Sequence, residues 1–169
     1  MSQSPANPPH QPRAPRQPAS DVAPFDIPAG FRPLPTMGDF IVANGPLYLR
    51  HEGDSVQLGF RVERRHTNPL GNCHGGMLAS FCDMLLPISI HRKGPEASRR
   101  LLPTINLQLD YLAPAPFGAW VEGEAQVLRT TRSLVFAQGL VSADGAICTR
   151  VSGIFKIGPP FPGSFEVTG

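Results

Sequence analysis

The sequence predicts an α+β fold in which a curved antiparallel β-sheet wraps around one long central helix. Residues 77–86 are apolar on nearly every helical face, so this helix must be buried on all sides. The segments before and after it alternate polar and apolar residues with the period of a β-strand. A single helix of this kind can be buried only if the sheet curls around it.

Two strands are expected before the helix. Residues 46–50 and 56–62 flank Glu52-Gly53-Asp54, which is a hairpin signature, so the two strands should pair antiparallel. The loop that follows, residues 66–76, contains Asn-Pro, Leu-Gly-Asn and Gly-Gly, which are turn and breaker signals. The helix should begin at the Gly-Gly pair and bend, or end near Ile90, because of Pro87.

Four strands are expected after the helix. The first, residues 104–111, has one apolar and one polar face because its residues alternate. Its apolar positions are Ile105, Leu107, Leu109 and Tyr111. The other three strands are residues 120–128, 133–141 and 147–157. The short segments between them, residues 130–132 and 143–146, are suited to tight hairpins.

The two ends of the chain are expected to lie outside the folded domain. Half of the 20 prolines fall in residues 1–35, and a polar, proline-rich segment buries too little surface to repay its ordering. We therefore expect a disordered extension over residues 1–37, a domain over 38–160 and a C-terminal tail over 161–169. The extension should be dispensable, although a role as a ligand for a proline-binding module is an alternative.

Composition argues against several classes of function. The net charge is +2 and there is no basic run, so a nucleic-acid partner is not expected. No apolar stretch is long enough to span a membrane and the N-terminus lacks the apolar core of a signal peptide, so we expect a cytoplasmic protein without membrane association. The three cysteines form neither a Cys-x-x-Cys pair nor a zinc-like pattern, so no metal site is expected.

The strongest candidate site combines the loop with an acid in the helix. Asp83 lies within the apolar run, where a carboxylate costs several kcal/mol unless it is paired or protonated. It could serve structurally by bonding a neighbouring backbone group. However, Gly75 begins the helix, where unpaired N–H groups and the positive end of the helix dipole can receive a developing oxyanion. Asn68 and His74 bring an amide and an imidazole to the same loop.

These residues resemble a known family. The pattern Asn68-x5-His74-Gly75-Gly76-x6-Asp83 is similar to the motif of hotdog-fold acyl-CoA thioesterases of the PaaI-like type, which are related to 4-hydroxybenzoyl-CoA thioesterase. Residues 103–115, with a Tyr-x-x-Pro ending, resemble the family's strand after the central helix. The resemblance covers roughly residues 40–158. It implies a hotdog fold and hydrolysis of a medium-chain or aryl acyl-CoA to free acid and coenzyme A, with the thioester as substrate and no cofactor.

The residues and the resemblance together assign roles. The Gly75 N–H would hold the carbonyl oxygen, and Asp83 would act either as general base or as nucleophile. In the family pattern, Asn68 orients the water or the thioester, and Thr104 falls where related enzymes place a hydroxyl beside the acid. Thr104 could equally be an ordinary strand residue, and His74 could bond either the loop or the substrate.

Coenzyme A carries phosphates, so cations should lie near its path. Arg129 and Arg132 flank a predicted hairpin where the family carries basic residues. Arg99 and Arg100 form a second candidate pair. All four could instead be solvated surface charges.

The spacing along the helix bears on assembly. Gly75 and Asp83 are eight residues apart, which is about 12 Å along a helix axis. One carbonyl cannot touch both, so a shared thioester would require the acid from one subunit and the N–H from another, across a two-fold axis. The resemblance implies the same arrangement, as a homodimer or a dimer of dimers. Two other functions stay open: a hydratase or dehydratase acting on acyl thioesters, and a non-catalytic acyl-CoA sensor.

Overall fold

A computed structural model describes residues 26–35, 38–53, 55–93 and 100–160. The expected C-terminal tail and most of the expected N-terminal extension lie outside these residues. The helical segments are α1 (Asp39–Asn44), the 3-10 turn η1 (Arg64–His66) and α2 (Gly75–Lys93). The strands are β1 (Arg32–Pro33), β2 (Tyr48–Glu52), β3 (Ser55–Arg61), β4 (Thr104–Tyr111), β5 (Trp120–Thr130), β6 (Leu134–Ala143) and β7 (Ala146–Lys156).

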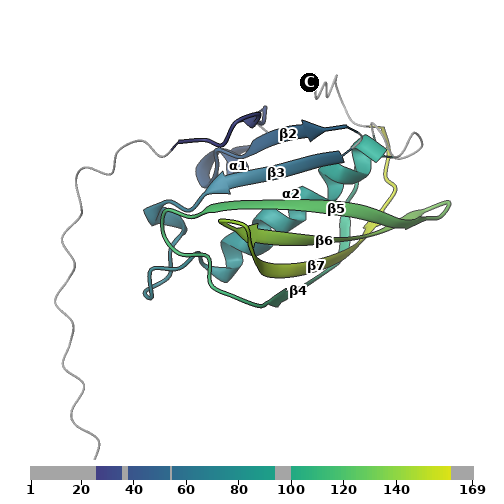
Figure 1. Cartoon of the computed structure of the whole chain (residues 1–169). Helices are drawn as coiled ribbons and strands as arrows, with labels where there is room; N and C mark the ends of the chain where they lie inside the picture. Colours follow the sequence, from purple (N-terminus) through teal and green to yellow (C-terminus); the bar gives the residue numbers. More distant parts are fainter. Residues whose placement is uncertain (1–25, 36–37, 54, 94–99, 161–169) are drawn as a thin grey trace, which may run out of the picture.

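The strands form one seven-stranded sheet in the order β1-β2-β3-β5-β6-β7-β4, and every neighbouring pair is antiparallel. β2 and β3 form a hairpin, and β5 to β7 form a meander. β4 pairs with β7 and forms one edge of the sheet. Figure 1 shows α2 lying across one face of this sheet. The predicted order of two strands, one helix and four strands is confirmed, with the short β1 added at the edge.

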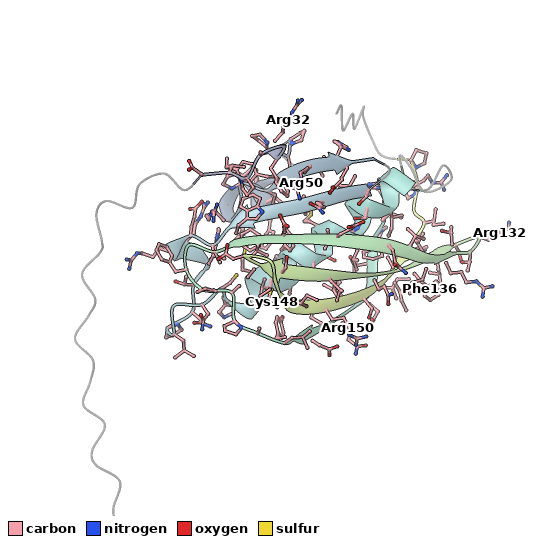
Figure 2. All side chains as sticks on the ribbon, viewed as in Figure 1. Arg32, Arg50, Arg132, Phe136, Cys148 and Arg150 are labelled. Atoms are coloured by element: carbon pink, nitrogen blue, oxygen red, sulfur yellow. The ribbon has the colours of Figure 1, made fainter. Side chains whose placement is uncertain are left out.

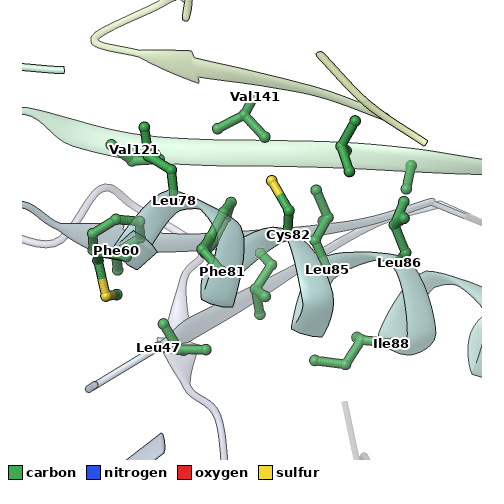
Figure 3. Close-up of a cluster of buried hydrophobic side chains, with 14 of the residues drawn as sticks. Leu47, Phe60, Leu78, Phe81, Cys82, Leu85, Leu86, Ile88, Val121 and Val141 are labelled. Atoms are coloured by element: carbon green, nitrogen blue, oxygen red, sulfur yellow. The ribbon is translucent and has the colours of Figure 1, made fainter. Parts of the chain in front are cut away.

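The core fixes α2 against the sheet. Leu78, Phe81 and Leu85 are at most 3% exposed and pack with Val121 and Val141 from the sheet (Figure 3). Burying a side chain of this size stabilises a fold by about 1.5–3 kcal/mol. The helix is therefore held in one position, and the residues on its other side are held with it.

That other side is not covered by the described residues, which corrects the expectation of a helix buried all round. Five residues of α2 spaced along one stripe stay half-buried: Ala79, Ser80, Asp83, Met84 and Pro87. The sheet covers only one face of the helix. The carboxylate of Asp83 is consequently half-buried rather than enclosed. The helix also continues through Pro87 to Lys93 instead of ending near Ile90.

β4 departs from the predicted alternation. Its pairing with β7 shifts register between Thr104 and Asn106, so Ile105 occupies a β-bulge. Thr104 pairs with the buried Phe155, as Leu109 pairs with the buried Val151. The bulge therefore places Thr104 on the face of β4 that looks toward α2. Strict alternation had placed Thr104 on the polar face, with Asn106.

The folded domain begins earlier than residue 38, contrary to the expected boundary. Phe31 is only 8% exposed, and its ring lies edge-on to Trp120 with a centroid distance of 4.9 Å. The Arg50 guanidinium covers the same ring at 4.6 Å. β1 then pairs with β2 through Arg32 and Leu49. One buried aromatic ring is thus enough to attach this polar, proline-containing segment to the domain.

This attachment predicts a difference between two truncations. A chain lacking residues 1–35 should melt at least about 5 °C below a chain lacking only residues 1–25, because it loses the Phe31 packing. Phe31→Ala in the full chain should show a similar drop by thermal unfolding. Phe40→Ala is the matched control, since Phe40 is 62% exposed. Equal melting temperatures for the two truncations would contradict the proposed anchor.

Candidate active site

The loop before α2 is a compact bend. A bridge between Thr67 and Cys73 closes it, and Gly71 supplies the positive φ of +80° that the turn requires. The Asn68 side-chain oxygen accepts hydrogen bonds from the N–H groups of Leu70 at 2.9 Å and Asn72 at 3.2 Å. Asn68 therefore organises the loop with its oxygen, and only its NH₂ group is left to contact a substrate.

The first turn of α2 is capped by His74. Its backbone oxygen accepts from the N–H groups of Met77 at 2.9 Å and Leu78 at 3.2 Å. Its ring Nδ1 accepts from the Gly76 N–H at 2.9 Å, so a neutral His74 ring carries its proton on Nε2. Of the two open readings for His74, the structure shows the bond to the loop.

One backbone N–H of this turn has no hydrogen-bond partner among the described residues. Among the described residues, the Gly75 N–H makes no hydrogen bond, whereas those of Gly76, Met77 and Leu78 are all satisfied. It lies at the positive end of the α2 dipole. The turn thus presents a single N–H of the kind that stabilises an oxyanion.

The structure brings Thr104 and Asp83 together. The Thr104 hydroxyl donates to Oδ1 of Asp83 at 2.7 Å. This contact depends on the bulge at Ile105, which turns Thr104 toward the helix. Within the described residues, Oδ2 of Asp83 makes no hydrogen bond. One carboxylate oxygen is therefore fixed, and the other is left for water or substrate.

Tyr111 is a site residue that the sequence did not single out. At the far end of β4, its hydroxyl donates to the Gly75 carbonyl at 2.9 Å. The only sequence signal was its place in the Tyr-x-x-Pro ending. Burial raises the pKa of its phenol, so Tyr111 keeps the proton that it donates.

The three candidate arginines that the structure describes do not gather at this site. Arg129 is an exposed residue near the end of β5, and Arg132 is exposed on the β5–β6 turn. Figures 1 and 2 show this turn, with Arg132, at the end of the sheet away from the start of α2. Arg100 donates to the Gly158 carbonyl at 2.6 Å and so has a structural contact, and Arg99 lies outside the described residues. Among the described residues, none of Arg100, Arg129 and Arg132 is brought to Gly75 or Asp83.

All three cysteines are buried and unpaired. Burial raises the pKa of Cys73 and of Cys82 to about 12, and also raises that of Cys148. Because the thiolate is the reactive form, these thiols should be inert. In the part of the chain that the structure describes, no three His, Cys, Asp or Glu side chains are arranged to hold a metal ion. None of the helices described is long and apolar enough to cross a bilayer.

The thiol burial predicts a reactivity pattern. At pH 8 an aromatic disulfide reagent should modify essentially none of the three cysteines in the native protein. At Cys73 and Cys82 a pKa about four units above the pH leaves roughly one thiolate in 10⁴, and Cys148 is only 1% exposed. All three should react in denaturant. Absorbance of the released thiol measures both states. Rapid modification of one thiol in the native protein would contradict this description of the core.

Comparison with known proteins finds a family model that matches part of the chain. A family model described as "Thioesterase superfamily" matches residues 70–148, which run from the loop through Asp83 and Thr104 to β7. This segment, which is slightly less than half of the chain, resembles the thioesterase superfamily. The match includes Gly75 and Tyr111, so the donor, the acid and their hydroxyl partners all lie inside the family segment.

Individual relatives agree with this family. The chain is 25% identical over 136 residues to a Pseudomonas aeruginosa protein named as an esterase, covering 79% of this chain and 98% of that one. It is 30% identical over 80 residues to acyl-coenzyme A thioesterase 13 of Mus musculus, covering 46% and 53% respectively. It resembles the solved structure of a phenylacetic acid degradation-related protein of Ralstonia eutropha with a TM-score of 0.62 and 22% identity, over 75% and 92% of the chains. The hotdog fold and the PaaI-like resemblance are confirmed.

Proposed function

We propose that the protein hydrolyses acyl-CoA thioesters to free acid and coenzyme A. The observation that carries the proposal is that one helix presents an open N–H at Gly75 and a carboxylate at Asp83 with one oxygen fixed by Thr104. A thioester hydrolase needs these two kinds of group, one for the developing oxyanion and one for water or the acyl carbon. The names of the mouse and Pseudomonas relatives support this reaction class.

In the proposed reaction, the Gly75 N–H polarises the thioester carbonyl and holds the negative charge on its oxygen. As general base, Oδ2 of Asp83 takes a proton from water, the oxygen of that water bonds to the acyl carbon, the carbon–sulfur bond breaks, and the proton passes to the departing thiolate. As nucleophile, Oδ2 itself bonds to the acyl carbon while the carbon–sulfur bond breaks and coenzyme A leaves as the thiolate. Water then cleaves the anhydride to the free acid and the Asp83 carboxylate, and a proton from this step passes to the thiolate. Single-turnover hydrolysis in ¹⁸O-water separates the routes, because only the nucleophilic route lets an unlabelled Asp83 oxygen leave in the acid.

We further propose that the site is completed by a second copy of the chain. Gly75 and Asp83 are about 12 Å apart along α2, too far to act on one carbonyl. The half-buried stripe of α2 around Asp83 and the edge strand β4 with exposed Ile105 (58%) and Tyr111 (55%) are surfaces that a partner would cover. Two antiparallel α2 helices across a two-fold axis would pair each Asp83 with the partner's Gly75. A dimer of dimers satisfies the same geometry.

The substrate's nucleotide end is part of the proposal. In such a dimer, Arg129 and Arg132 are the candidates for contacts with the coenzyme A phosphates, because a guanidinium binds phosphate oxygens with two parallel hydrogen bonds. We also propose a cytoplasmic location, which three unpaired cysteines favour.

A panel of acyl-CoAs tests the function. Medium-chain and aryl acyl-CoAs are incubated with the protein, and the products are followed by a thiol reagent and by mass spectrometry. Release of free coenzyme A supports the hydrolase. A mass change of about 18 without thiol release would identify a hydratase or dehydratase. Tight binding without turnover would identify an acyl-CoA sensor and overturn the proposal.

A further inference from the structure

β4 contacts α2 at both of the groups that the proposed reaction uses. Thr104, the first residue of β4, donates to the Asp83 carboxylate, and Tyr111, the last, donates to the Gly75 carbonyl. A single strand therefore fixes the acid and the start of the helix that carries the oxyanion donor. The Thr104 hydroxyl acts on the proposed catalytic acid directly. The Tyr111 hydroxyl contacts neither the acid nor the Gly75 N–H, so its role in the reaction needs a separate explanation.

The start of α2 has a particular need for such a contact. Gly75 and Gly76 are consecutive glycines, and glycine gains more backbone freedom than any other residue when it is not held. The direction of the Gly75 N–H depends on the two peptide groups that flank Gly75. An N–H that varies in direction would lose the alignment on which stabilisation of an oxyanion depends.

Hydrogen bonds hold both of these peptide groups. In the peptide before Gly75, the His74 oxygen accepts from Met77 and Leu78. In the peptide after Gly75, the Gly76 N–H donates to the His74 ring, and the carbonyl accepts from Tyr111. Tyr111 supplies the only one of these contacts that comes from outside the loop and the helix.

The Tyr111 ring also lies directly against the donor residue. A Cβ built on Gly75 would be 3.4 Å from both Cζ and the hydroxyl oxygen of Tyr111, which is ordinary contact distance. The phenol therefore stands beside Gly75 as well as bonding to its carbonyl. Tyr111 as a whole is 55% exposed.

We propose that Tyr111 is a positioning residue for the thioesterase reaction, acting through Gly75: its phenol aims the Gly75 N–H at the thioester oxygen. This inference rests on the proposed function. It assigns the hydroxyl a role in the transition state rather than in stability alone. Because the oxyanion develops after binding, loss of the hydroxyl should lower kcat and leave KM nearly unchanged.

The test compares Tyr111→Phe with Tyr48→Phe in the full chain. Tyr48 is a matched control because it is half-buried, its ring lies 5.7 Å from that of Trp120, and among the described residues its hydroxyl makes no hydrogen bond. We expect Tyr111→Phe to lower kcat about tenfold, as for loss of one neutral hydrogen bond. Its KM should stay within about twofold. Hydrogen exchange of the hydrogen-bonded Gly76–Leu78 amides should become faster in this variant and remain unchanged in Tyr48→Phe.

The outcomes separate this inference from the proposed function. A parent protein that hydrolyses no acyl-CoA would overturn the proposed function, and with it a catalytic role for the Tyr111 contact. With an active parent, normal kcat in Tyr111→Phe overturns the positioning role alone. A fall in kcat that is accompanied by an equal rise in KM, or by general loss of exchange protection across the sheet, overturns it as well, because that pattern indicates only a structural contact.

Discussion

Asp83→Asn should lower kcat by at least about a hundredfold, because the substitution removes the only carboxylate placed on the open stripe of α2 and the general base or nucleophile with it. The amide has the same shape as the acid, and its oxygen can still accept the Thr104 hydroxyl that now lies 2.7 Å from Oδ1. The fold should therefore survive with an unchanged melting temperature. Steady-state kinetics and thermal unfolding measure the two effects separately.

Asp110→Asn is the matched control for this experiment. Asp110 lies on β4 as Thr104 does, but its carboxylate pairs with Arg150 at 2.5 Å on the surface. Exposed ion pairs contribute about 0–1 kcal/mol, so this variant should retain normal turnover and nearly normal stability. If Asp83→Asn keeps its kcat within a few fold of the parent, Asp83 is structural and the proposed mechanism is wrong.

The order of strands and helix could be predicted because hydrophobic period reports which face of an element is buried. The alternation in β6 and β7 and the continuous apolar run of α2 were sufficient. The run could not show that Asp83 faces an uncovered stripe. That depends on how far the sheet extends around the helix, which is a tertiary property. An apolar residue such as Met84 is expected both where a sheet covers the helix and where a second subunit covers it, so the sequence does not distinguish the two cases.

Features that depend on a single residue of register or on one long-range contact were not predictable. The bulge at Ile105 inserts one residue into β4, and a shift of one residue moves a side chain to the other face. Thr104 reaches Asp83 for that reason. The packing of Phe31 on Trp120 joins segments about ninety residues apart, and no local pattern marks it.

The motif, in contrast, was readable because its geometry is local. His74 caps the turn that begins at Gly75, and the bonds of Asn68 lie within its own loop. No pattern in the sequence indicates that the Asn68 amide has a bound oxygen and an available NH₂ group. The difference arises only in the folded loop, where the Asn68 oxygen accepts hydrogen bonds from the N–H groups of Leu70 and Asn72.

Mixing two inactive variants should restore activity to about a quarter of the parent value, because the proposed site combines Asp83 of one subunit with Gly75 of the other. Asp83→Ala removes the acid. Gly75→Pro removes the N–H at the first residue of α2, where proline's fixed φ is tolerated. Gly75→Ala is the control for bulk, since it adds the Cβ at an ordinary 3.4 Å from Tyr111 but keeps the N–H.

The expected recovery of a quarter of the parent activity follows from random pairing of the two variants. When equal amounts of the two variants are unfolded and refolded together, about half of the dimers are mixed, and each mixed dimer has one intact site and one site with both defects. Native mass spectrometry confirms the exchange, and Gly75→Ala mixed with Asp83→Ala should give more activity than the proline pair. A site built within one chain leaves a defect in every site, so mixed dimers that are present but inactive would exclude the shared site.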